Sequence, residues 1–286
     1  MPPKTVEEKF KKFTQIQHAL EKSGMYIGSI ENVIESTWRW DPSESKMIWS
    51  DIKVNKGLQK IYDEILMNAT DHIHEDSNTD KIEIDVDRES GKITIKNNGE
   101  GIPIVIHKEH NVYVPELIFG EMLTSTHYNN EDTRLSAGTH GLGAKLTAIF
   151  SKWFSVETVD SNEGKKFSQV FENNLSKKSK PKITAYKGKP YTKISFIPDY
   201  ERFGLTSLDK GNYEIMWRRA FDVSAITPKN VSITFNGEKI PVKTFEGFVD
   251  LFVGNKDSTP RITHSCKRWE VIVTPAINES FHQISF

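Results

Sequence analysis

The chain has 286 residues, and its 39 acidic and 38 basic residues leave a formal net charge of −1. This length predicts one large domain and part of a second, and the near-neutral balance excludes a chain-wide attraction to nucleic acid or membrane. A single cysteine, Cys266, excludes an internal disulfide, and no apolar run predicts a membrane span or signal peptide, so we expect a soluble intracellular protein.

Helical spacing is the first pattern along the chain. Residues 4–22 predict an amphipathic arm or first helix that Gly24 ends, because apolar residues recur there at helical spacing. They are Phe10, Phe13, Ile16 and Leu20. A tryptophan-rich stretch over residues 38–49 follows and is interpreted as a loop. Residues 57–74 then predict a core-facing helix, whose apolar stripe comprises Leu58, Ile61, Ile65 and Ala69.

Alternating apolar residues predict strands over most of the remaining chain. Residues 82–86 and 93–95 indicate a hairpin, and Asn236-Gly237 indicates the turn of another. Residues 209–223 look helical. The further strand candidates are 154–159, 167–171, 182–186, 192–197 and 231–235. Helices interleaved with tightly connected strands predict an α+β sandwich with a mixed or largely antiparallel sheet.

Two further stretches have an unusual composition. The basic run at residues 177–182 is interpreted as a solvated loop in preference to a DNA contact, because its flanks are ordinary. Residues 281–286 have a strand-like pattern with no polar tail after it. We therefore expect the chain to be the N-terminal part of a longer protein.

A polar stripe accompanies the apolar one on the helix predicted at residues 57–74. Glu64, Asn68 and Asp71 share one face, since residues four and seven apart do so on a helix. The surrounding residues are so apolar that we expect the helix to be mostly buried, and a buried acid and amide need specific partners. Asn68 as a magnesium ligand and Glu64 as the base that activates a water would satisfy them.

Two glycine-bearing segments follow. Residues 97–101 come directly after a predicted strand; an ordinary β-turn is the simple interpretation, but the Asn97 side-chain oxygen could also accept a bond from an exocyclic amine. Residues 138–145 lead from a polar loop into an apolar helix, where backbone amides and Lys145 could surround phosphate oxygens. The second segment is neither a dinucleotide fingerprint nor a Walker loop, because the flanking residues do not match either motif.

The chain resembles the Bergerat-fold ATPases shared by gyrase, type II topoisomerases, heat-shock chaperones, mismatch-repair proteins and histidine kinases. Within that group it is similar to the N-terminal ATPase region of eukaryotic-type DNA topoisomerase II. The matching segments are MYIGS at 25–29, DEILMNA at 63–69, YVPELIFG at 113–120, GLGAKL at 141–146 and RWEV at 268–271. The segments at 25–29 and 113–120 look specific to topoisomerases, which weighs against a chaperone or mismatch-repair ATPase of the same fold.

The resemblance implies a role for individual residues. Glu64 would activate the attacking water with Lys145 as a second catalytic group, and Asn68 would hold the Mg²⁺ that bridges the phosphates. Asn97 would read adenine, with Asp71 and Gly101 beside it and Thr192 beneath the nucleotide. Ser125, Thr126 and His127 match a segment that touches the ribose and phosphates. The phosphate-cradling lid would comprise Gly138, Thr139, His140, Gly141, Leu142, Gly143, Ala144 and Lys145.

Several positions depart from the family pattern. The family has Asn where this chain has His127, Arg and Asn in place of Thr139 and His140, and Tyr in place of Leu142. Phe10 stands where a tyrosine of the N-terminal arm is common. Backbone contacts in the lid should survive these changes, whereas side-chain contacts are open to change. The departures favour a divergent homologue, conceivably from a large DNA virus.

The resemblance also implies a domain division and partners. Residues 1–253 would form the ATPase domain, with 1–22 as its arm, and 254–286 would begin a transducer domain. The family's Gln-Thr-Lys loop, whose lysine contacts the γ-phosphate, would lie beyond this chain, so we expect slow turnover and mostly monomeric behaviour. The full-length protein would be an ATP-dependent homodimer acting on duplex DNA, in the nucleus if eukaryotic. A nucleotide-binding module without useful catalysis is the alternative from another class.

Overall fold

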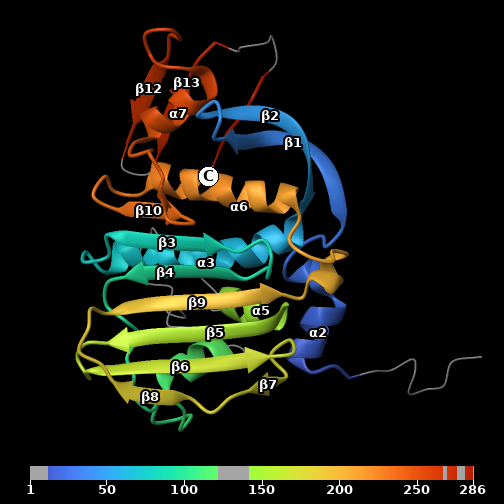
Figure 1. Cartoon of the computed structure of the whole chain (residues 1–286), viewed down its shortest axis with the longest axis vertical. Helices are drawn as coiled ribbons and strands as arrows, with labels where there is room; N and C mark the ends of the chain where they lie inside the picture. The colour runs from blue at the N-terminus through green and yellow to red at the C-terminus, as the bar shows by residue number, and fades with distance from the viewer. Residues whose placement is uncertain (1–11, 122–141, 267–268, 276–280, 286) are drawn as a thin grey trace, which may run out of the picture.

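A computed structural model describes residues 12–121, 142–266, 269–275 and 281–285 of the chain. Its main sheet contains β3 (Lys81–Val86), β4 (Ile93–Asn98), β5 (Ser151–Asp160), β6 (Lys165–Glu172), β7 (Lys177–Lys178), β8 (Lys182–Ala185), β9 (Tyr191–Pro198), β10 (Ser232–Phe235) and β11 (Glu238–Lys239). The strand order is β11-β10-β3-β4-β9-β5-β6-β7, with β8 also paired to β6 (Figure 1). β10 and β3 are parallel and the other pairs antiparallel, so the fold is α+β with a mixed sheet, as predicted.

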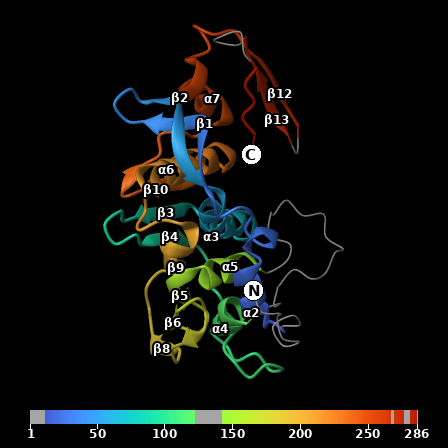
Figure 2. The same cartoon turned by 90° about the vertical axis from the view of Figure 1, so that its right-hand side faces the viewer.

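Helices cover one face of this sheet. The helices are α2 (Gln15–Glu21), α3 (Lys56–Glu75), α4 (Val114–Gly120), α5 (Gly143–Ile149), α6 (Lys210–Ile226) and α7 (Phe245–Val253), with 3₁₀ turns at Ser23–Met25 and Tyr200–Phe203. Seen edge-on, the sheet has α2, α3, α4 and α5 on the same side (Figure 2). None of the helices in the described ranges is long and apolar enough to cross a membrane.

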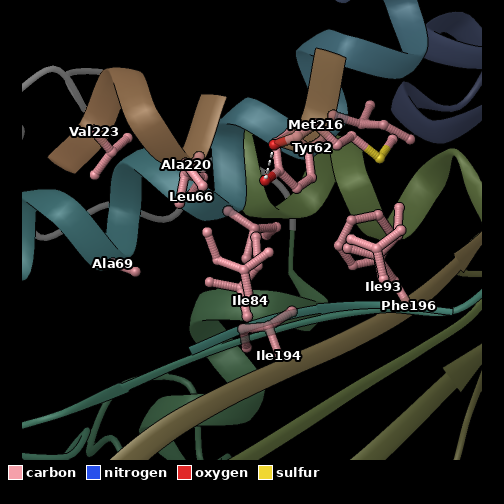
Figure 3. Packing of buried hydrophobic residues seen from close by; sticks show 14 of the residues in the cluster. Tyr62, Leu66, Ala69, Ile84, Ile93, Ile194, Phe196, Met216, Ala220 and Val223 are labelled. Atoms are coloured by element: carbon pink, nitrogen blue, oxygen red, sulfur yellow. Dashed lines mark hydrogen bonds between the residues drawn. The ribbon is translucent and has the colours of Figure 1, made fainter. Parts of the chain in front are cut away.

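The core lies between α3, α6 and the sheet. Tyr62 and Leu66 on α3 face Met216 and Ala220 of α6 on one side, and Ile84 of the sheet lies on the other (Figure 3). The Tyr62 hydroxyl donates to the main-chain oxygen of Met216 at 3.0 Å, which ties the two helices together. The predicted apolar stripe of α3 is buried throughout, because it faces this core.

Two smaller hairpins complete the fold: β1 (Asn32–Asp41) with β2 (Lys46–Asn55), and β12 (Ile262–Ser265) with β13 (Glu270–Val273). The interpretation of residues 38–49 as a loop is therefore wrong. Trp38 lies directly opposite Trp49, with ring centroids 5.4 Å apart, and Trp40 packs on Phe221. These cross-strand and helix contacts stabilise the hairpin although its charged residues interrupt the alternation.

Other expectations are partly met. The predicted helices at 57–74 and 209–223 and the predicted strands are present, and the turn at Asn236-Gly237 has the positive φ angles, 48° and 80°, that a tight hairpin requires. The first helix ends at Glu21, and Gly24 lies in the 3₁₀ turn that follows. Residues 281–285 are not a strand, so that expectation is wrong. The sequence patterns also missed α4, α7 and the β12–β13 hairpin.

Candidate functional site

Glu64, Asn68 and Asp71 lie on one face of α3, as their spacing predicts. The Glu64 side chain is 21% exposed, Asp71 is partly exposed and Asn68 is exposed. The expectation that this acid and amide are buried is therefore wrong. The polar stripe lies beside the buried apolar stripe and opens outward, where a ligand can reach it.

The carboxylate of Glu64 lies between two groups. A Cβ placed on Gly143 would meet Glu64 Oε2 at 1.9 Å and its carboxyl carbon at 2.8 Å, so Gly143 leaves room that any other residue would fill. On the other side, the Lys60 ammonium pairs with Glu64 Oε1 from one turn earlier on α3. The C-terminal end of the glycine-rich segment therefore lies directly against the acid that the sequence analysis assigned as the catalytic base.

Helix α5 is fixed against α3 at this point. The Thr147 hydroxyl donates to the main-chain oxygen of Ile61 at 2.8 Å, and Thr147 shares a helix face with Gly143 because the two are four residues apart. Lys145 points to a different side of α5, about 200° round from Gly143. It is only 2% exposed, and burial lowers its pKa to about 8.

A second polar group surrounds the end of β4. Asn97 is 5% exposed and lies opposite Thr192 of β9, which in turn lies opposite Thr158 of β5. The Thr158 and Thr192 hydroxyls are 3.0 Å apart, and Thr158 also accepts a bond from the Ile102 main-chain N–H at 3.0 Å. A Cβ on Gly101 would lie 1.8 Å from the Val159 oxygen, so this approach requires glycine. The structure thus brings Asn97, Gly101 and Thr192 together.

The loop after Asn97 is held by the end of α3. Asp76 accepts a bond from the Glu100 main-chain N–H at 2.6 Å, and this bond is the main cause that lowers the pKa of Asp76. The Thr79 hydroxyl donates to the Asn98 oxygen at 3.2 Å and lies 2.8 Å from His72 Nδ1. Because α3 rises about 1.5 Å per residue, Glu64 and the loop contacts at Asp76 lie roughly 18 Å apart along one helix.

Some candidate residues lie outside the described residues. They are Phe10, Ser125, Thr126, His127, Gly138, Thr139, His140 and Gly141. Leu142, Gly143 and Ala144 are described, and Leu142 forms the N-cap of α5. Within the described ranges, no cluster of three or more His, Cys, Asp or Glu residues could hold a metal ion.

Sequence reasoning did not find Lys60, Asp76 and Thr158. Lys60 was within reach of a sequence argument, because a lysine four residues before a glutamate on a helix predicts an ion pair. Asp76 and Thr158 had no such signal. Their contacts join segments that are 24 and 56 residues apart, and only the folded chain brings these together.

Comparisons with known proteins give the family of the chain. Residues 53–176 match the family model described as histidine kinase-, DNA gyrase B-, and HSP90-like ATPase. DNA topoisomerase 2 of Arabidopsis thaliana is 40% identical over 99% of the chain, which spans 20% of that protein's length. The chain therefore covers about a fifth of this relative.

The chain covers a larger share of two solved structures than of this relative. The ATPase region of Saccharomyces cerevisiae topoisomerase II has a TM-score of 0.89 and 38% identity, with 93% of this chain and 71% of that one covered. The ATPase and transducer domains of DNA topoisomerase II from Balamuthia mandrillaris give a TM-score of 0.91 and 38% identity, covering 97% and 71%. The chain belongs to the family of type II DNA topoisomerases, within their N-terminal ATPase region.

Proposed function

We propose that the chain binds ATP with Mg²⁺, hydrolyses it, and serves as the ATPase gate of a type II DNA topoisomerase. The observation that carries the proposal is the contact between Glu64 and Gly143. It joins an acid on the outward face of α3 to the end of a glycine-rich segment, which is the pairing that phosphate binding and water activation require.

The nucleotide base belongs at the other end of the site. The Asn97 amide nitrogen donates to the Asn98 main-chain oxygen at 3.0 Å, which leaves its side-chain oxygen to accept a bond from the adenine amine. Gly101 and Thr192 flank that position, and Asp71 lies on the α3 face between the two ends. The phosphates would then extend toward Gly143 at the N-terminal end of α5.

Asn68 fits a magnesium ion. Its side chain is exposed one helical turn from Glu64, and an amide oxygen is a hard ligand of the kind Mg²⁺ takes together with waters and substrate phosphates. When bound, the ion would neutralise charge on the phosphates. Asn68 is the residue on α3 that would hold it.

Glu64 is the proposed general base. Its carboxylate would orient and deprotonate the attacking water, while the ion pair with Lys60 and the space left by Gly143 hold it in place. Lys145 would add positive charge near the phosphates: side chains on a helix lean toward its N-terminus, which for α5 is the glycine-rich end. Most of the catalysis would come from positioning and charge stabilisation.

Nucleotide binding would act on the whole protein. Closure of the lid and of the arm at residues 1–22 over ATP would favour a homodimer that traps a duplex DNA segment. Residues 254–286 would begin the transducer domain that follows the ATPase domain at 1–253. The protein would act at intracellular DNA.

Hydrolysis by the 286-residue chain and its Glu64→Gln variant tests this proposal. The variant keeps the size of the side chain but not the base, so we expect turnover to fall at least about 100-fold while binding of a non-hydrolysable ATP analogue persists. Glu75→Gln, at the exposed end of the same helix, is the control and should retain full activity. Equal turnover in Glu64→Gln and the unmodified chain would contradict the catalytic role of Glu64. The chain would then be a nucleotide-binding module without useful catalysis.

Calorimetric titration of the analogue with and without magnesium tests Asn68. In the unmodified chain, magnesium should tighten binding, whereas Asn68→Ala should lose most of this dependence. If magnesium has the same effect on both proteins, Asn68 does not hold the ion.

A further inference from the structure

Positive charge is concentrated in one part of the chain. Residues 173–198 contain seven lysines and no aspartate or glutamate, although the whole chain has a formal net charge of −1. The lysines are Lys177, Lys178, Lys180, Lys182, Lys187, Lys189 and Lys193. A charge surplus of this size predicts a partner of opposite sign.

The fold arranges most of these lysines along one edge of the main sheet. Lys177 lies opposite Glu172 at one end of β6, Lys182 lies opposite Ser168, and Ala185 lies opposite Lys165 at the other end. β7 and β8 form the lower edge in Figure 1, at the opposite end of the molecule from α7 and the β1–β2 hairpin. Lys177, Lys178, Lys180 and Lys182 therefore follow the edge beside β6, which as an eight-residue strand is about 26 Å long, and Lys187 and Lys189 continue after β8.

Four of these lysines lack an acidic partner. Lys177 pairs with Glu172 at 2.8 Å, Lys178 with Glu116 at 3.0 Å, and Lys193 with Glu157 at 3.1 Å. Within the part of the chain that the structure describes, Lys180, Lys182, Lys187 and Lys189 are exposed and form no ion pair. We refer to these four as the basic edge.

Protection of a sheet edge does not account for the basic edge. Lysines on edge strands discourage pairing with another chain, and Lys182 on β8 suits that role. Lys180 precedes the strand, and Lys187 and Lys189 lie in the connection between β8 and β9, where no ladder needs protection. Three of the four charges therefore need another explanation.

We infer that the basic edge binds the phosphate backbone of duplex DNA. A duplex presents about one negative charge per 1.7 Å of its axis, so an extended row of unpaired cations can contact several phosphates at once. The inference deepens the proposed function by assigning a contact surface to its DNA partner. The sequence alone favoured a solvated loop, which is wrong in part, because Lys177 and Lys178 lie on β7 and Lys182 begins β8. The position at the edge beside β6 and the missing acidic partners favour DNA.

The test measures binding of the chain to a fluorescently labelled 30-base-pair duplex of arbitrary sequence by fluorescence anisotropy. The protein concentration is raised to about 100 µM, because dissociation constants for non-specific DNA binding reach about that value. One variant changes the four lysines of the basic edge to glutamine. The control variant makes the same charge change at Lys53, Lys229, Lys239 and Lys256, which are exposed elsewhere. Thermal unfolding checks that both variants are folded.

We expect the basic-edge variant to bind at least about tenfold more weakly than the control at 100 mM salt. The slope of log affinity against log salt, taken from about 50 to 200 mM, should fall by about 3 to 4, since each phosphate contact contributes about 0.9. DNA should also shield these four lysines from acetylation. Equal binding by the two variants, or no binding by the unmodified chain, would overturn the inference.

Two further measurements separate the alternatives. If poly-glutamate at matched charge competes as well as unlabelled duplex, the basic edge is a surface for acidic protein segments and the DNA assignment is wrong. ATP hydrolysis without DNA should be equal in the unmodified chain and both variants. Hydrolysis that fails in all three, with intact DNA binding, would instead count against the proposed ATPase activity.

Discussion

Glu64 has a defined position because of what stands on either side of its carboxylate. The Lys60 ammonium forms an ion pair with Oε1, and Gly143 has no side chain that would occupy the space next to Oε2. Both neighbours therefore help to place the acid for water activation.

Gly143→Ala tests the steric part of this arrangement. The added methyl group would lie 1.9 Å from Glu64 Oε2, so the carboxylate must move. We expect hydrolysis to fall by about 100-fold, because a misplacement of about 1 Å costs that much. Gly24→Ala is the control, since a Cβ there meets nothing within 4 Å. Full activity in Gly143→Ala, measured as steady-state turnover, would show that the contact does not set the position of the base.

The lowered pKa of Lys145 predicts how the affinity for nucleotide depends on pH. Burial lowers its pKa to about 8, so its neutral fraction rises from about a tenth at pH 7 to about nine-tenths at pH 9. Phosphate binding favours the charged form, so affinity for the ATP analogue should fall about tenfold from pH 7 to pH 9, with proton uptake on binding near pH 8. Calorimetry in buffers of different ionisation enthalpy measures both.

Lys145→Arg provides the comparison for this pH dependence. Arginine stays charged over the whole range, so this variant should bind with little change between pH 7 and pH 9. The same loss of affinity with pH in both proteins would assign the titration to another group.

At the scale of elements, the start of α3 is a junction between four segments. Asn55 is fully buried and caps α3 by accepting a bond from the Leu58 N–H at 3.0 Å. Its amide donates to the main-chain oxygens of Ile30 at 2.7 Å and Phe203 at 3.2 Å, and its own N–H donates to Asn212 of α6 at 2.9 Å. One residue therefore joins the start of the helix that carries Glu64 to three other segments.

Asn55→Ala tests this junction. It removes the cap and leaves buried polar groups without partners, so we expect the free energy of unfolding to fall by about 2 to 4 kcal/mol. Thr244→Ala removes the cap of α7, where Thr244 accepts a bond from the Gly247 N–H at 3.0 Å, and should cost only about 1 kcal/mol. Urea denaturation compares the two. Equal losses would mean that the Asn55 contacts beyond the cap contribute nothing.

At the scale of the whole molecule, the fold separates the site from the charged edge. The helices lie on one face of the sheet and carry the Glu64 end of the candidate nucleotide site, whereas Asn97 and Thr192 of its other end lie on β4 and β9 (Figures 1 and 2). The basic edge lies around β8, at the end of the molecule opposite the β1–β2 hairpin (Figure 1). A DNA contact at that edge would leave the helix-covered face open for nucleotide. The two activities can therefore be tested independently, as the proposed variants do.

Local patterns determined much of this protein. The buried stripe of α3, the β3–β4 hairpin and the turn at Asn236-Gly237 depend on residues close in sequence, so periodicity and turn chemistry predict them. The same spacing placed Glu64, Asn68 and Asp71 on one face. Family resemblance added the functional roles, which no local pattern supplies.

Tertiary contacts decided the rest. The β1–β2 hairpin is stabilised by packing of Trp40 on Phe221, which lies far along the chain, so the local pattern of this tryptophan-rich stretch did not predict its strands. The contact of Glu64 with Gly143 depends on how α3 and α5 pack, and the unpaired Lys182 reaches the sheet edge only because β8 pairs with β6. Such features depend on distances between segments that are remote in sequence, and these distances exist only in the folded chain.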